Sequence, residues 1–150
     1  MKQPPTLEET FPLLKSTPYK VTSRRTPCYN CIAWAAGDDR RFWWPNDCGF
    51  WPNGISTGLA IASFVDAFAT LGYKPCSNGD LEAGIEKVAL FAVGERPTHA
   101  ARQLPNGEWT SKCGRGVDIS HTIDGLNGSE YGRPVEFLSR AVVIETASTT

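Results

Sequence analysis

Residues 29–35 read YNCIAWA, and this stretch predicts a helix that begins close to a cysteine. Alanine is the strongest helix former, Ile32 and Ala36 fall on one side of such a helix, and Gly37 is the residue expected to end it. Unpaired N–H groups and the helix dipole stabilise an anion at this end. Cys31 is therefore a candidate nucleophile, and a buried structural thiol is the competing interpretation.

Strands dominate the second half of the chain. Four segments have a strand-like apolar pattern, and they are residues 87–93, 99–104, 108–112 and 135–138. Asn106-Gly107, between the middle two, favours a hairpin with a two-residue turn. A buried helix is predicted over residues 58–71. Helices followed by strands indicate one α+β domain over residues 1–150, with an N-terminal arm at 1–27 and a frayed tail at 147–150.

His99 opens the predicted hairpin and is one of only two histidines in the chain. If its side chain faces the helix, it can accept the proton of the Cys31 thiol. A strand histidine bonded to a backbone carbonyl is the competing interpretation. A two-residue turn would place Lys112 on the same side as His99, and a charged lysine accepts no hydrogen bond from imidazole. Asp118 is the best candidate to orient His99, with Ser111 and His121 as alternatives.

A tryptophan-rich segment follows the predicted helix. Trp43, Trp44 and Trp51 are candidate substrate-binding residues, because flat amphipathic rings bind sugars, peptides or acyl chains at little entropic cost. The alternative is that these rings cover the core in place of regular structure. We favour that alternative for most of them and expect one or two to remain at a cleft.

Cys28 and Cys31 form a CxxC pair, which allows a zinc site or a redox couple. The chain has no second CxxC and no HxxxH, and the remaining cysteines are scattered singly. The pair also lacks the preceding strand of a thioredoxin-like unit. A zinc or redox protein is therefore the third hypothesis, and we expect no metal or other cofactor.

Several longer motifs point to known families. They are YNCIAWA at 29–35, WWP at 43–45, GYKPC at 72–76, EKVALFA at 86–92, HAARQ at 99–103, WTSK at 109–112, DISH at 118–121 and YG at 131–132. Together they resemble a family of small, uncharacterised bacterial proteins, and the cysteine-then-histidine order resembles the NlpC-type papain-like superfamily. The resemblance implies N-terminal helices packed on a small antiparallel sheet. It also implies Cys31 as nucleophile, His99 as base and a polar third residue.

The resemblance further implies a peptidase, amidase or acyltransferase that acts through an acyl-enzyme on a peptide, amide or acyl substrate. Such domains also serve as toxins or effectors. The second hypothesis is a non-catalytic module on the same fold that binds a ligand or a protein partner.

The composition of the chain limits the classes of partner and the cellular compartment that we expect. The formal net charge of −1 and the pI near 6.1 provide no basic surface for nucleic acid. No apolar run approaches the roughly 20 residues that span a bilayer, and residues 1–5 lack the apolar region of a secretory signal. We therefore expect a cytoplasmic protein with neither nucleic acid nor membrane as partner, although signal-independent export is compatible with the sequence. The five cysteines are expected to be thiols.

Overall fold

The computed structural model describes residues 6–26, 28–45, 49–113 and 116–142. The predicted frayed tail at 147–150 lies outside the described residues. In chain order the elements are α1 (Leu7–Thr10), the 3-10 helix η1 (Pro12–Lys15), β1 (Tyr19–Val21), α2 (Cys31–Ala35), α3 (Ile61–Ala69), β2 (Lys74–Cys76), β3 (Ile85–Val93), β4 (Arg96–Gln103), β5 (Trp109–Lys112), β6 (Asp118–His121) and β7 (Arg133–Ala141).

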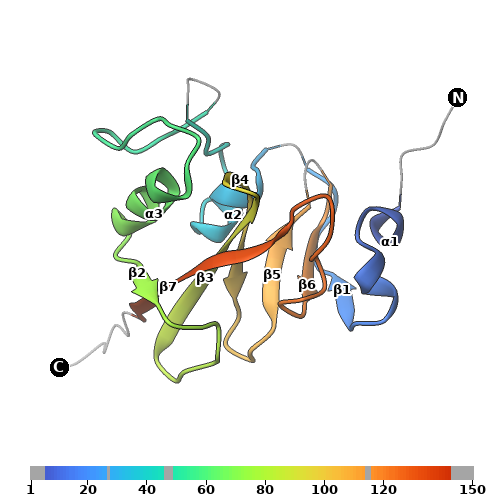
Figure 1. The fold of residues 1–150 in the computed structure, drawn as a ribbon. Coiled ribbons are helices and arrows are strands. Elements are labelled where there is room, and N and C mark those ends of the chain that lie inside the picture. Colours follow the sequence, from blue (N-terminus) through green and yellow to red (C-terminus); the bar gives the residue numbers. More distant parts are fainter. Residues whose placement is uncertain (1–5, 27, 46–48, 114–115, 143–150) are drawn as a thin grey trace, which may run out of the picture.

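All seven of these strands form one sheet with the order β1-β6-β5-β4-β3-β7-β2, and every neighbouring pair is antiparallel (Figure 1). The predicted α+β papain-like architecture, with N-terminal helices packed on a small sheet, is therefore wrong. The sheet dominates the fold, and the helices are short. Residues 19–21, predicted to lie in an N-terminal arm, instead form the edge strand β1.

Each face of the sheet carries its own hydrophobic core. On one face α2 and α3 pack against strand residues that include Leu90 and Ala100. On the other face the N-terminal segment contributes Phe11 and Leu14, which cluster with strand residues such as Phe91. Because side chains alternate along a strand, the face on which a residue lies decides which of these two cores it can reach.

The β4–β5 hairpin differs from the predicted one by a single residue. Gln103 pairs with Trp109, and the Leu104 N–H donates to the Glu108 carbonyl at 2.7 Å, so the loop consists of residues 105–107. Gly107 occupies the left-handed region at φ +92°. A third loop residue shifts the register by one and exchanges the faces of every β5 side chain. Ser111, rather than Lys112, therefore lies on the side of His99.

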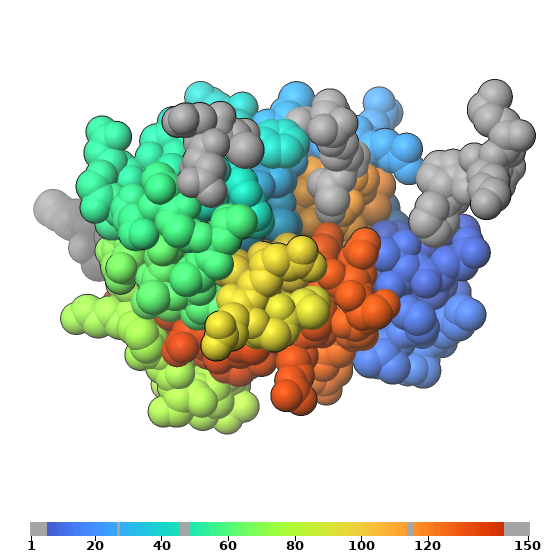
Figure 2. Space-filling model, turned by 45° about the horizontal axis from the view of Figure 1, so that its top comes forward, coloured from blue at the N-terminus to red at the C-terminus, as the bar shows by residue number. Residues whose placement is uncertain are grey.

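A β-bulge interrupts the β3–β4 ladder near its turn. Phe91 pairs with His99, whereas Ala92 pairs with Pro97, which leaves Thr98 as an extra residue in β4. The Thr98 hydroxyl donates to the Tyr131 carbonyl at 2.6 Å. Bulges bend a strand and redirect its side chains. In Figure 2 this hairpin end (yellow) lies against the orange-red segment that precedes β7.

Candidate functional site

Cys31 occupies the first position of α2, as predicted, but its thiol is enclosed. The residue is 8% exposed, and its Sγ donates to the Thr98 carbonyl at 4.0 Å. Burial raises the pKa of this thiol to about 11, and the backbone N–H groups of Ala100, Ile32 and Cys31 itself oppose that rise only in part. Desolvation therefore outweighs the anion-stabilising effect of the helix start, and the thiol stays protonated at neutral pH.

Asn30 ties the start of α2 to the tryptophan-rich segment. Its Oδ1 accepts from the N–H groups of Ala33 at 3.1 Å and Trp43 at 3.0 Å, and its Nδ2 donates to the Trp43 carbonyl at 2.9 Å. We expect Asn30→Ala to lower the free energy of unfolding by about 2 kcal/mol, because a helix cap and two further bonds are lost. Urea denaturation measures this value. Asn30→Asp keeps both acceptor bonds and should lose only about half as much; an equal loss would contradict the assignment.

His99 lies on the opposite face of the sheet from the α2 core. Its ring stacks on Tyr131 with the centroids 4.0 Å apart and the planes 7° apart, and meets Phe91 edge-on at 5.1 Å. The neighbouring Ala100 belongs to the core that contains Cys31. Within the described residues, no hydrogen bond joins Cys31 to His99. The structure therefore does not bring the predicted nucleophile and base together.

His99 instead begins a buried relay across three strands. The His121 Nδ1 donates to the Thr122 carbonyl at 2.6 Å, which leaves the His121 Nε2 to accept from Ser111 Oγ at 2.7 Å. Ser111 Oγ then accepts from the His99 Nε2 at 2.9 Å. This order assigns the proton of each group, and it leaves the buried His99 Nδ1 as an acceptor with no partner in the described part of the chain.

Burial also determines the charge state of both histidines. It lowers the pKa of His99 well below 6.5, with a smaller contribution from His121. It lowers the pKa of His121 to about 4, although the bond to Thr122 acts in the opposite direction. Both rings are neutral at pH 7 as a result. Ser111 and His121, the two alternatives to Asp118, are the residues that hold the His99 ring.

Asp118 does not orient His99, because it lies on the other face of the sheet. Its Oδ2 accepts from the Tyr29 hydroxyl at 2.6 Å, and it pairs across the ladder with Lys112. Burial, followed by this hydrogen bond, raises the pKa of Tyr29 to about 12. The Lys112 Nζ lies 5.3 Å from the centre of the Tyr29 ring and donates to the Gly116 carbonyl.

The three candidate tryptophans pack mainly as cover for the α3 core. Trp43 is buried and its Nε1 donates to Asp38 at 2.9 Å. Trp44 and Trp51 are half-buried, and both meet Phe64 edge-on with centroids 5.4 and 5.0 Å apart. These contacts agree with the alternative in which the rings cover the core in place of regular structure. None of the three lines the cavity beside the N-terminal segment.

The cysteines near α2 are separate thiols. Cys28 is exposed and Cys31 is buried, and both are free. Cys48 lies outside the described residues. Within the described ranges, no group of three or more His, Cys, Asp or Glu side chains is arranged to hold a metal ion.

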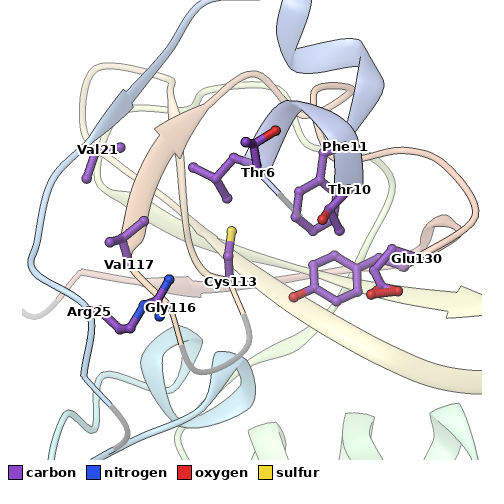
Figure 3. Close-up of a pocket in the computed structure, with 11 residues that line it drawn as sticks. Thr6, Thr10, Phe11, Val21, Arg25, Cys113, Gly116, Val117 and Glu130 are labelled. Atoms are coloured by element: carbon purple, nitrogen blue, oxygen red, sulfur yellow. The ribbon is translucent and has the colours of Figure 1, made fainter. Parts of the chain in front are cut away.

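A cavity of about 530 Å³ opens between the N-terminal segment and the β5–β6 end of the sheet (Figure 3). Its walls combine carbon-rich side chains with hydroxyl, thiol and charged groups. They are Thr6, Leu7, Thr10, Phe11, Val21, Arg25, Cys113, Gly116, Val117, Glu130 and Tyr131. Figure 3 shows the Cys113 sulfur near the middle of this space, with Arg25 and Glu130 on opposite sides of the view.

One thiol and two charged side chains in the cavity wall can form polar contacts with a ligand. Burial raises the pKa of Cys113 to about 12, so its thiol is protonated and acts as a weak donor. Arg25 and Glu130 are exposed at the rim, and neither forms an ion pair or a side-chain hydrogen bond with another described residue. No described residue therefore competes with a ligand for either charge.

One family model, that of a domain of unknown function designated DUF7689, matches residues 20–139. The chain belongs to this family. No curated protein and no solved structure matches it. The DUF7689 domain contains the cavity wall from Val21 to Tyr131, whereas Thr6, Leu7, Thr10 and Phe11 precede the matched residues. The family match specifies no activity, and the resemblance to NlpC-type hydrolases stays a prediction.

The cavity between the DUF7689 domain and the N-terminal segment could not be predicted from the sequence. Arg24-Arg25 has the pattern of a basic pair on a solvated loop, and Glu130 stands in no recognisable motif. The nearest signal is the Tyr131-Gly132 pair, which belongs to the motif set but carries no chemistry by itself. The described residues contain no helix long and apolar enough to cross a membrane.

Proposed function

We propose that this protein binds a small amphipathic molecule in the cavity between its N-terminal segment and the β5–β6 end of the sheet. The observation that carries the proposal is a hollow of about 530 Å³ with apolar walls and two charged side chains that pair with no other described residue. Small-molecule sites fall at roughly 300–1,000 Å³ and combine apolar walls with a few polar groups that orient the ligand.

The apolar residues of the cavity wall supply the surface that a ligand would cover. Leu7, Val21 and Val117 offer carbon surface whose removal from water drives association. Phe11 is itself held by contact with the Tyr131 ring, with centroids 5.0 Å apart. This packing keeps part of the wall formed before a ligand arrives and lowers the entropic cost of binding.

A hydrolase built on Cys31 is the weaker candidate. Its thiol has a raised pKa, and its hydrogen-bond partner is a backbone carbonyl and not an imidazole. The neutral His99 is committed to Ser111 on the far side of the sheet. Nucleophilic catalysis by cysteine needs the thiolate and a base within reach of it.

Binding of the fluorescent apolar anion anilinonaphthalene sulfonate (ANS) tests the proposal. We expect the folded protein to bind one ANS at pH 7.5, and Val117→Trp to weaken that binding at least tenfold because the indole fills the cavity. Val135→Trp is the matched control, since Val135 is 45% exposed on β7 and lies outside the cavity. Near-ultraviolet circular dichroism shows whether each variant is folded.

Thr10→Trp supplies a second block from the opposite wall if Val117→Trp does not fold. Equal ANS affinity in the folded wild type, the blocked variants and the control would place ANS elsewhere and would overturn the proposal. Absence of ANS binding by the folded wild type would overturn it as well.

A further inference from the structure

We infer that the ligand is a zwitterion with an apolar middle, of the kind formed by a short apolar peptide with free termini. The inference rests on the proposed function and specifies the class of molecule bound. It is carried by the opposite charges of Arg25 and Glu130, which lie on opposite sides of one apolar-walled cavity (Figure 3). A ligand that fills the space places one end near each charge.

The Arg25 side suits a carboxylate. A guanidinium donates two parallel N–H bonds to the two oxygens of a carboxylate, a geometry that a single amine does not reproduce. Lys112 lies behind this wall, with its Nζ bonded to the carbonyl of Gly116, which itself lines the cavity. Burial lowers the pKa of Lys112, the negative charge of Asp118 opposes that shift, and the Arg25 charge adds only a smaller lowering.

The Glu130 side suits an ammonium group. Its carboxylate is exposed and forms no ion pair or side-chain hydrogen bond with another described residue, so it can accept from a ligand amine. It would repel a second anionic group at that position, which disfavours dicarboxylates and polyphosphates. The apolar side chains of the peptide would then lie between the two ends, against Phe11 and Val117.

The dipeptide Leu-Phe provides the test, together with its C-terminal amide and its N-acetyl form. Affinity is measured from the shifts of the Leu7, Val21 and Val117 methyl resonances at pH 7. We expect each blocked form to bind the wild type roughly fivefold more weakly, which is the upper range for an exposed ion pair. Arg25→Gln should abolish the difference between acid and amide. Glu130→Gln should abolish the difference between amine and N-acetyl.

Arg24→Gln and Glu95→Gln are the matched controls, because both residues are exposed and neither lines the cavity. Each should keep the full discrimination between free and blocked peptides. Blocked peptides that bind the wild type as tightly as Leu-Phe would overturn the inference, and so would discrimination that survives in Arg25→Gln and Glu130→Gln. If ANS still binds and Val117→Trp still blocks it, the cavity proposal stands without the zwitterion. If neither ANS nor Leu-Phe binds the folded protein, both fall.

Discussion

Gly132→Ala should lower the free energy of unfolding by roughly 4 kcal/mol, the sum of backbone strain and overpacking. Gly132 has φ +75°, a left-handed conformation that residues with a side chain rarely adopt. A Cβ at this position would overlap the carbonyl oxygen of Ala92 and lie 2.7 Å from its carbon. Backbone atoms of a central strand cannot move aside as the end of a flexible side chain can. Urea denaturation at pH 7.5 measures the effect.

Gly94→Ala separates the two contributions. Gly94 also has a positive φ, at +60°, but a Cβ added there would meet nothing within 4 Å. Gly94→Ala should therefore lower the free energy of unfolding only by the strain contribution, which is about 1 kcal/mol. If Gly132→Ala is no more destabilising than Gly94→Ala, Gly132 and β3 do not approach each other closely. Loss of this approach would also release Tyr131, the preceding residue, from its position on His99.

Acidification from pH 7.5 to pH 5.5 should destabilise the fold by about 3 kcal/mol through the two buried histidines. The folded pKa of His99 lies well below 6.5 and that of His121 at about 4, whereas both titrate near 6.5 in the unfolded chain. Below pH 6.5 the unfolded chain thus binds protons that the native fold does not. Each histidine then lowers the free energy of unfolding by about 1.4 kcal/mol per pH unit until the pH reaches its folded pKa.

The pH dependence is measured by urea denaturation between pH 5 and pH 8. Stability should be constant above about pH 7 and should fall towards pH 5. His121→Gln removes one of the two titrations while keeping an amide that can bond Ser111, so its slope should be about half that of the wild type. A wild-type stability that does not change over this interval would mean that the histidines are not buried as neutral rings.

The strands were predictable where their apolar pattern was long. Residues 87–93 have such a pattern, and they lie within β3. The edge strands β1 and β2 have only three residues each, which is too few to show an alternation of apolar and polar residues. The number of strands in the sheet could therefore not be predicted from the sequence. α3 spans Ile61–Ala69, inside the predicted range of 58–71.

The predicted site depended on register and burial, which local sequence does not report. One additional loop residue after Leu104 exchanged Lys112 for Ser111 beside His99. The position of Cys31 at the start of a helix was correct, but the same packing that forms this helix desolvates the thiol. The cavity joins residues from both ends of the chain, so only the folded chain brings Thr6 and Glu130 to one space.

The position of β7 has a consequence for how the protein folds. Of the strands described, it is the farthest along the chain, and yet it lies inside the sheet, between β3 and β2. Until β7 is in place, β2 has no neighbour and one side of β3 stays open, exposing hydrogen-bonding groups to other chains. The sheet therefore closes late, through contacts between distant segments, and folding belongs to the slow, millisecond-to-second regime of non-local β topologies.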